Sequence, residues 1–178
     1  MATSAPASTL EIRRLDAVDA TQLQGLADVL IDCVEGGASV SFMLPMTREK
    51  SLAFWRKVAD GVARGERVLF VAEDAQGIAG TVQVILDLPE NQPHRAEIAK
   101  MLVHRRARRQ GAGAALMRAA EDAARRAGRT LLVLDTGDAT AARLYERLGW
   151  RAAGTVPRYA LMPDGDECAT TFYYRDLA

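Results

Sequence analysis

Residues 95–113, RAEIAKMLVHRRARRQGAG, constrain the fold more than any other stretch of the chain. A strand-like run leads into an arginine-rich turn, and the turn opens into an alanine-rich helix. Gly111 and Gly113 lack a Cβ atom, so the backbone of this R-x-x-G-x-G turn can approach a ligand closely. The first N–H groups of the helix have no partner within it, and the helix dipole is positive at that end. We therefore predict an anion site here, suited to a pyrophosphate.

Size and charge limit the class of protein. The 178 residues predict one domain with one core, over residues 10–178, after a flexible tail at residues 1–9. Positive and negative side chains number 23 each, so the zero net charge argues against a nucleic-acid partner or a polybasic membrane protein. No apolar run is long enough to span a membrane, and the first residues do not form a signal peptide. We expect a cytoplasmic protein, as a monomer or homodimer.

Cysteine spacing gives no sign of a metal centre. Cys33 and Cys168 are far apart in the sequence, and neither belongs to a CxxC or Cys/His pattern. We predict buried thiols and no metal.

Apolar periodicity predicts alternating strands and helices. The expected strands cover residues 10–16, 67–73, 77–86, 96–103, 131–135, 150–156 and 169–176, and the expected helices cover residues 19–36, 47–65, 112–127 and 138–149. The second and third strands read as an antiparallel hairpin, and the last two are joined by a long connection with a PDG turn. The order β-α-α-β-β-β-α-β-α-β-β predicts one mixed sheet with helices on its faces, an α/β or α+β sandwich.

This order and the R-x-x-G-x-G turn resemble the GNAT family of acetyl-CoA-dependent N-acetyltransferases. Residues 138–150, DATAARLYERLGW, look like the N-x-x-A-x-x-x-Y-x-x-x-G-[FW] segment of that family. The resemblance implies the GNAT fold, a mixed seven-stranded sheet flanked by about four helices, with acetyl-CoA as co-substrate. Segments such as EGGASVSFM, LLVLDT and the late PDG resemble the tabtoxin-resistance-protein branch more closely. That branch implies a β-lactam dipeptide toxin or a related small amino compound as acceptor.

The resemblance also implies where acetyl-CoA binds. In this family the strand before the turn carries a bulge and splays from the next strand, which admits the pantetheine arm. The backbone of Met101 would face the thioester carbonyl, and that of Val103 would bond the pantetheine amides. Asp138 stands where the family usually has Asn, as a further cofactor contact. The pyrophosphate would be wrapped by Arg108, Arg109, Gln110, Gly111, Ala112, Gly113 and Ala114, with the two arginines adding charge-assisted contacts.

The chemistry needs a base, because only a neutral amine attacks a thioester and a free alkyl amine is protonated at neutral pH. Glu97 lies on the strand that leads into the turn, where the family often places its catalytic carboxylate. Its other interpretation is a salt bridge to Arg95 or Lys100. Asp135 ends the next apolar strand, and it either caps the following turn or binds the acceptor's ammonium or its proton. Both carboxylates remain candidates for the base.

Tyr145 occupies the helix position where this family keeps its general acid, which gives the departing thiolate a proton or a hydrogen bond. Its other interpretation is a core tyrosine beside Leu144. The backbone N–H near Met101 would hold the oxyanion. For the acceptor we name Ser39 and Phe42, in an unusually apolar loop that either lines a pocket or packs over the core. Tyr159, in the late connection, is a further substrate candidate.

Two other functions remain open at this point. Gly111 and Gly113 begin a G-x-G-x-x-G/A pattern, and Asp135 follows near where a dinucleotide-binding oxidoreductase places its ribose-binding acid. Against this, the sixth position is Leu116 and two helices precede the second strand.

A non-catalytic acetyl-CoA sensor is the other alternative, and it would need neither Glu97 nor Tyr145. We expect an enzyme that transfers acetyl directly, because no cysteine falls at the predicted site.

Overall fold

The computed structural model describes residues 10–178, and the predicted tail at residues 1–9 lies outside the described residues. Seven strands form one mixed sheet in the order β1-β2-β3-β4-β5-β7-β6, flanked by four α-helices, which confirms the predicted fold class. The elements are β1 (Glu11–Leu15), α1 (Ala20–Glu35), α2 (Arg48–Ala63), β2 (Arg67–Asp74), β3 (Gly77–Ile85), β4 (Arg95–Val103), the 3-10 helix η1 (Arg105–Ala107), α3 (Ala112–Arg126), β5 (Leu131–Thr136), α4 (Ala139–Arg147), β6 (Arg151–Leu161) and β7 (Glu167–Asp176).

Side-chain caps fix the helix starts that the sequence predicted. Asp19 and Gln22 form a capping box at the start of α1, and Thr47 accepts a hydrogen bond from the Lys50 N–H at the start of α2. Asp138 caps α4 in the same way. The exception is α3, whose N-cap is Gly111 with no side-chain cap. This helix therefore begins with uncapped N–H groups.

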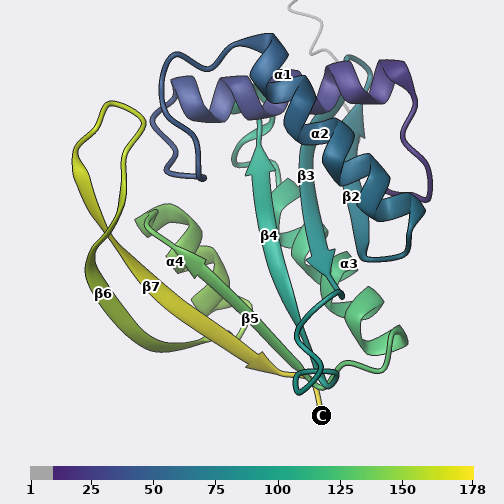
Figure 1. Cartoon of the computed structure of the whole chain (residues 1–178), viewed down its shortest axis with the longest axis vertical. Helices are drawn as coiled ribbons and strands as arrows, with labels where there is room; N and C mark the ends of the chain where they lie inside the picture. The colour runs from purple at the N-terminus through teal and green to yellow at the C-terminus, as the bar shows by residue number, and fades with distance from the viewer. Residues whose placement is uncertain (1–9) are drawn as a thin grey trace, which may run out of the picture.

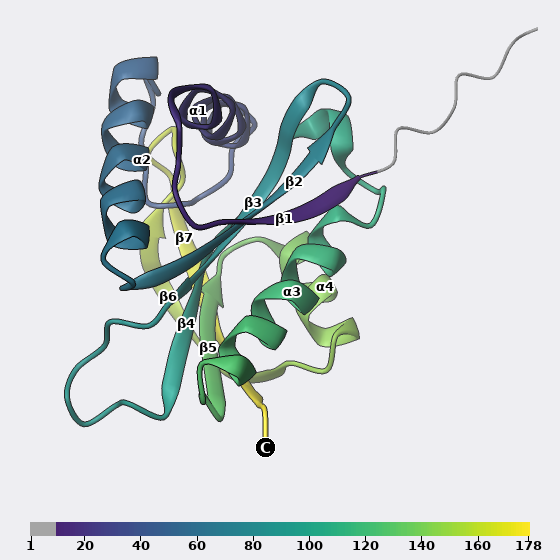
Figure 2. The ribbon, with the colours of Figure 1, turned by 90° about the vertical axis from the view of Figure 1, so that its right-hand side faces the viewer.

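Helices cover both faces of the sheet, and each face has its own core (Figure 2). On one face α1 and α2 pack on β2 and β3 around Trp55, Leu30 and Leu69. On the other face α3 packs through small residues, and Ala120 and Leu116 are fully buried against the sheet. Alternate residues of β2 therefore point to different cores, so that strand reads as a continuous apolar run.

The centre of the sheet carries an irregularity on β4. Thr81 of β3 pairs with Leu102, but Gln83 pairs with Ala99, so two residues of β4 stand opposite one residue of β3. This is a β-bulge at Lys100 and Met101, and Lys100 has a left-handed backbone with φ +49°.

Beyond this point β4 leaves its other neighbour. The parallel pairing of β4 with β5 covers only three positions and ends at Glu97 and Val133. Figure 1 shows the two strands together near the C-terminus of the chain and diverging away from it. We call their unpaired ends, residues 98–103 of β4 and 134–136 of β5, the fork. The structure therefore has both the bulge and the splayed strands that the resemblance implies.

The prediction for the end of the chain was partly wrong. β6 and β7 are longer than expected and form a hairpin, closed by a short turn in which the Met162 N–H donates to the Asp166 carbonyl at 2.7 Å. A bulge in β6 between Val156 and Ala160 hides this continuity, because Pro157 interrupts the alternation of the strand. In addition, β6 is an exposed edge strand without a buried face. None of the helices between residues 10 and 178 has the length and apolar character that crossing a membrane requires.

Candidate functional site

The turn before α3 presents a row of backbone donors. Arg109 and Gly111 have left-handed backbones, with φ +61° and +83°, and such alternation makes a concave nest of N–H groups. The first α-helical hydrogen bond of α3 runs from the Ala115 N–H to the Gly111 carbonyl. The N–H groups of the three preceding residues thus have no acceptor among residues 10–178. They belong to Ala112, Gly113 and Ala114.

Gly113 serves packing rather than backbone conformation. A Cβ atom at this position would lie 3.0 Å from Leu144 Cδ2 and 3.6 Å from Met101 Sδ. The absence of a side chain lets α4 and the end of β4 close against the start of α3. The two glycines of the motif are therefore needed for different reasons, Gly111 for its left-handed backbone and Gly113 for close packing.

The arginines of the turn mainly hold it in place. Arg105 binds Asp32 of α1 through its guanidinium and its backbone N–H, and Arg106 binds Asp74 and the carbonyl of Ile78. The Gln110 amide donates to the Arg106 carbonyl at 3.0 Å and closes the turn. Sequence reasoning did not find these anchors, because the two aspartates lie far away in the chain.

Arg108 faces β4 and the end of α1. Its Nε donates to the Val103 carbonyl at 3.2 Å, which also accepts a hydrogen bond from Cys33 Sγ at 3.6 Å. The Val103 backbone faces the fork, since its neighbour His104 donates its N–H the other way, to Ala79 of β3. Cys33 therefore lies beside the predicted cofactor strand, which the sequence did not indicate. Burial raises the pKa of its thiol, which keeps it protonated and a poor nucleophile.

The two candidate bases differ in their surroundings. Glu97 is the last residue of β4 that pairs with β5, and its carboxylate accepts a hydrogen bond from Arg95 at 2.9 Å. This is the salt bridge that the sequence offered as its other interpretation. Asp135 lies within the fork and is exposed, and among residues 10–178 it accepts a hydrogen bond from the Thr170 hydroxyl alone, at 3.2 Å. Asp135 thus carries a carboxylate with no ion-pair partner among the described residues.

Tyr145 packs in the core through its ring, and its hydroxyl is a candidate hydrogen-bond donor. It is 5 % exposed, and its ring packs on Trp150 and Tyr173 with centroids about 6 Å apart. No residue from 10 to 178 forms a hydrogen bond with its hydroxyl. Burial raises the pKa of Tyr145 well above its ordinary value, and the negative charges of Asp138 and Asp135 raise it further. The phenol therefore stays neutral and can donate a hydrogen bond.

Asp138 is used in the fold. Its carboxylate accepts hydrogen bonds from the N–H groups of Thr140 at 2.9 Å and Ala141 at 3.3 Å. Both oxygens are engaged as the cap of α4, and contact with a cofactor stays a prediction.

The acceptor candidates come from two segments that contact one another, the α1–α2 loop and the β6–β7 hairpin. The Ser39 hydroxyl donates to the Leu161 carbonyl at 2.9 Å and accepts from the Cys168 thiol, so it joins the α1–α2 loop to the β6–β7 hairpin. Phe42 packs edge-on against Phe54 of α2, which supports the core-packing interpretation of this residue.

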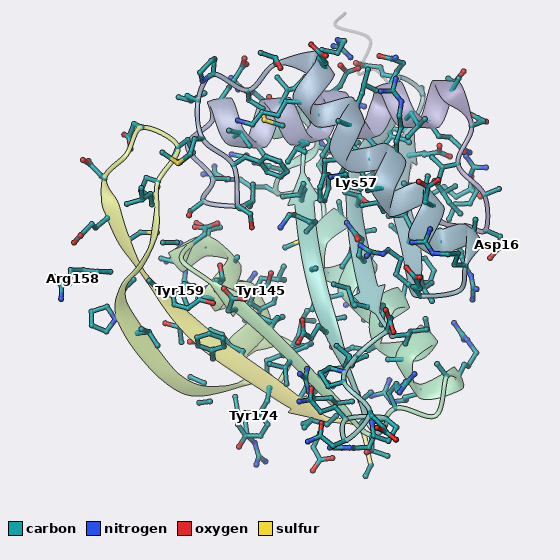
Figure 3. The ribbon with its side chains drawn as sticks, in the orientation of Figure 1. Asp16, Lys57, Tyr145, Arg158, Tyr159 and Tyr174 are labelled. Carbon is teal, nitrogen blue, oxygen red and sulfur yellow. The ribbon has the colours of Figure 1, made fainter. Side chains whose placement is uncertain are left out.

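Tyr159 lies on β6, in the β6–β7 hairpin. It is 51 % exposed, and its ring meets Phe172 of β7 edge-on at 5.5 Å. Phe172 pairs with Asp135 across the β5–β7 ladder, so Tyr159 reaches the neighbourhood of the fork. Figure 3 shows Tyr159 and Tyr145 on the same side of the molecule, whereas Arg158 lies at its outer edge.

One residue that sequence reasoning did not place in the site is Lys100. Its ammonium group donates to Ser41 Oγ at 3.1 Å and lies 5.9 Å from the centre of the Phe54 ring. Its place depends on the bulge of β4 and on a contact with a distant loop, and no local pattern in the sequence indicates either.

A separate hollow of about 590 Å³ lies between α1 and the β2–β3 turn. Its aspartates are engaged by other side chains, Asp28 by Arg48 and Asp32 by Arg105. It shares no residue with the fork, and the size of a hollow does not by itself make it a site. No cluster of His, Cys, Asp or Glu suitable for a metal ion occurs in the part of the chain that the structure describes.

Comparisons with known proteins identify relatives of this arrangement. Residues 65–152 match the family model described as the acetyltransferase (GNAT) domain. The sequence is 31 % identical over 126 residues to an uncharacterized N-acetyltransferase encoded in the hisH-hisA intergenic region of Azospirillum brasilense, covering 70 % of this chain and 73 % of that protein.

Solved structures share the fold. An N-acetyltransferase from Staphylococcus aureus Mu50 superposes with a TM-score of 0.79 at 20 % identity, covering 96 % of this chain and 100 % of that one. The yncA protein of Salmonella typhimurium, described as an acetyltransferase with its cofactor acetyl-CoA, superposes with a TM-score of 0.74 at 18 % identity, covering 95 % of this chain and 94 % of that one.

Proposed function

The chain belongs to the GNAT family of N-acetyltransferases, and we propose that it moves the acetyl group of acetyl-CoA directly to the primary amine of a small molecule. The observation that carries this proposal is the coincidence of two features. The pairing of β4 with β5 ends at Glu97, and the uncapped start of α3 lies at the other end of the same β4 segment. Together they offer unpaired strand backbone for an amide-bearing chain and N–H groups for a diphosphate.

The residues present fit acetyl-CoA. The pyrophosphate would be held by the N–H groups of Ala112, Gly113 and Ala114, in the nest that Arg109 and Gly111 begin. Arg108 is free of any carboxylate among residues 10–178 and can add charge to a phosphate. Acetyl-CoA supplies an activated acetyl group, as a thioester. Met101 lies in the bulge, where two residues of β4 face one residue of β3. Its N–H would point to the thioester carbonyl.

Asp135 is our first candidate for the base. It projects from the unpaired part of β5, whereas Glu97 lies where the strands still pair and shares its carboxylate with Arg95. The acceptor binds as an ammonium ion, which a carboxylate attracts. Asp135 would take the proton from the nitrogen, directly or through one water, and leave a neutral amine with a free electron pair. Glu97 remains the second candidate for this role.

Tyr145 would act on the departing sulfur. Cleavage of the thioester bond leaves the electron pair on the sulfur of coenzyme A, and a hydrogen bond from the phenol stabilises that charge. Because burial and two nearby acids raise the pKa of Tyr145, its own ionisation is unfavourable. We therefore assign it hydrogen-bond donation. The nitrogen loses its second proton to solvent as the amide forms, and solvent supplies the proton that completes the thiol.

The nature of the acceptor is the least constrained part. We propose a small amino compound, with amino-acid-like molecules and β-lactam toxins or antibiotics as the classes to examine first. The support is that the α1–α2 loop contacts the β6–β7 hairpin through Ser39 and Leu161, and that Tyr159 of this hairpin packs on Phe172, which pairs with Asp135. We also propose that the protein is cytoplasmic.

Release of coenzyme A thiol tests the proposal. We expect thiol release from acetyl-CoA with at least one member of a panel of amino acids, diamines and amine-bearing antibiotics. Initial rates should follow a sequential pattern, because the direct reaction needs both substrates bound. Acetyl-CoA binding without thiol release for any amine would indicate a sensor and contradict the proposal. NAD(H) serves as the control ligand and should not shift the melting temperature.

A further inference from the structure

Lys100 brings a positive charge to the fork. Its side chain is partly buried beneath the α1–α2 loop, where the ammonium group donates to Ser41 Oγ at 3.1 Å and lies 5.9 Å from the Phe54 ring centre. A hydroxyl and an aromatic face solvate an ammonium group only in part. No carboxylate between residues 10 and 178 forms an ion pair with it. Lys100 is therefore a partly desolvated cation with capacity for an anionic partner.

Asp135 provides the opposite charge on the other strand of the fork. Leu134 of β5 packs in the core beneath α3, so its neighbour Asp135 faces the other side of the sheet, the side of α1 and α2, where the Lys100 ammonium lies. The negative charge of Asp135 also opposes the effect of burial, which lowers the pKa of Lys100. They do not form an ion pair, and among residues 10–178 Asp135 accepts a hydrogen bond from the Thr170 hydroxyl alone. The two strands of the fork thus place one cation and one anion on the same side of the sheet, and neither has an ion-pair partner in the part of the chain that the structure describes.

The backbone at Lys100 is strained in a way that fixes this position. Lys100 has φ +49° and Ser41 has φ +76°, a region that residues other than glycine adopt at a cost of about 1–3 kcal/mol. These two residues contact one another through their side chains, although 59 positions separate them in the sequence. Two strained residues in contact beside a reaction site indicate that the arrangement serves the site rather than the stability of the fold.

We propose that Lys100 is the anion-binding residue of the acceptor site, and that the acceptor is a small zwitterion, a primary amine that also carries a carboxylate. Its ammonium faces Asp135 on β5, and its carboxylate binds Lys100 on β4. This inference rests on the proposed function and narrows its substrate class to amino acids and their close analogues.

The charge arrangement also excludes other amines. A diamine would place a second cation near Lys100, and the repulsion in a partly desolvated site would weaken its binding. An amino-acid ester would lose the ion pair with Lys100 while keeping the ammonium contact with Asp135. The ester is the sharper comparison, because its amine is less basic and thus more often neutral and ready to react. A preference for the free acid over its ester cannot come from intrinsic reactivity.

The test measures one ratio, kcat/KM for an amino acid divided by kcat/KM for its methyl ester, over a panel of natural amino acids and their esters. We expect the ratio for the wild type to exceed about ten for the best acceptor, from the strength of a charge-assisted hydrogen bond. Lys100→Met should lower that ratio about tenfold or more, and Lys100→Arg should keep most of it. Lys57→Met is the matched control, since Lys57 is exposed on α2 and should leave the ratio unchanged (Figure 3).

The outcomes separate this inference from the proposed function. A Lys100→Met enzyme that loses activity equally on acid and ester has an unchanged ratio, which would assign Lys100 a structural role and overturn the inference. A wild type that acetylates diamines or esters in preference to free acids would also overturn it, while leaving the acetyltransferase function intact. If no amine of any class releases thiol, the proposed function itself fails. Binding of acetyl-CoA, measured by calorimetry, checks that each variant is folded.

Discussion

The two sides of the fork are built by different means. The proposed cofactor side, from β4 through the turn to α3, consists of one continuous segment, and its donors are backbone N–H groups aligned by Arg109 and Gly111. The proposed acceptor side is assembled from the α1–α2 loop, the bulge of β4 and the β6–β7 hairpin. Its contacts join residues that are far apart in the sequence, such as Ser39 with Leu161 and Ser41 with Lys100.

This difference would allow the acceptor side to change while the cofactor side is kept. Backbone donors survive most side-chain substitutions, so the cofactor side depends on a few glycines and on helix geometry. The acceptor side depends on side chains in loops, which can change without disturbing the sheet. If this view is right, variants on the two sides should separate cleanly into effects on acetyl-CoA and effects on the acceptor or the chemistry.

The largest effect is expected at Asp135. Asp135→Asn removes the charge and the basicity but can still accept from Thr170, so we expect kcat/KM for the acceptor to fall about 100-fold or more. Glu97→Gln should cost about tenfold or less, because that carboxylate is engaged by Arg95 at the closed end of the fork. Thiol-release kinetics measure both. The affinity for acetyl-CoA should stay unchanged, and a larger loss at Glu97 would reverse our assignment of the base.

Gly111→Val tests the cofactor side. A β-branched residue at φ +83° forces the turn to rearrange and misaligns the N–H groups, so the Kd of acetyl-CoA should rise about tenfold to 100-fold. Gly128→Val is the matched control, since Gly128 follows the other end of α3 with φ +73° and equally open space around its Cβ position. Both variants should lose similar stability in thermal unfolding. An equal loss of acetyl-CoA affinity in both would show that strain in α3, rather than the donors at its start, governs binding.

The same contrast describes what the sequence could and could not predict. The helices, the order of the elements along the chain and the turn before α3 follow from local patterns, such as the R-x-x-G-x-G motif and the caps Asp19 and Thr47. The place of Lys100 could not be predicted, because it depends on a bulge and on a loop 59 positions away. The β6–β7 hairpin was misjudged for a related reason, since an exposed edge strand with a bulge lacks the alternation that marks a strand. Neighbouring residues determine local geometry, whereas a site formed by distant loops depends on contacts that local patterns do not show.

Tyr145→Phe addresses the chemistry between the two sides. Removing the hydroxyl should lower kcat about tenfold, the magnitude of one hydrogen bond to a developing charge. Because the pKa of Tyr145 is raised by burial and by Asp138 and Asp135, the phenol stays protonated beyond about pH 10, so the loss should be uniform across the pH profile. Rate profiles of the wild type and the variant measure this. An alkaline decline present in the wild type and absent in Tyr145→Phe would show that the phenol ionises, contrary to this assignment.

The smallest effect is expected at Ser39, which joins the two walls of the acceptor side. Ser39→Ala removes the hydrogen bond to Leu161, at a cost of about 1 kcal/mol in the free energy of unfolding. The loosened contact between loop and hairpin should raise KM for the acceptor about threefold, with the Kd of acetyl-CoA unchanged.

Thr155→Val is the matched control for this effect. It removes the hydrogen bond between the Thr155 and Thr171 hydroxyls, 2.9 Å apart on the same hairpin, without touching the α1–α2 loop. Its stability should fall by a similar amount, but KM for the acceptor should not change. If Ser39→Ala raised the Kd of acetyl-CoA as much as KM, the loop would serve both substrates, and the division into a backbone side and a side-chain side would not hold at the mouth of the fork.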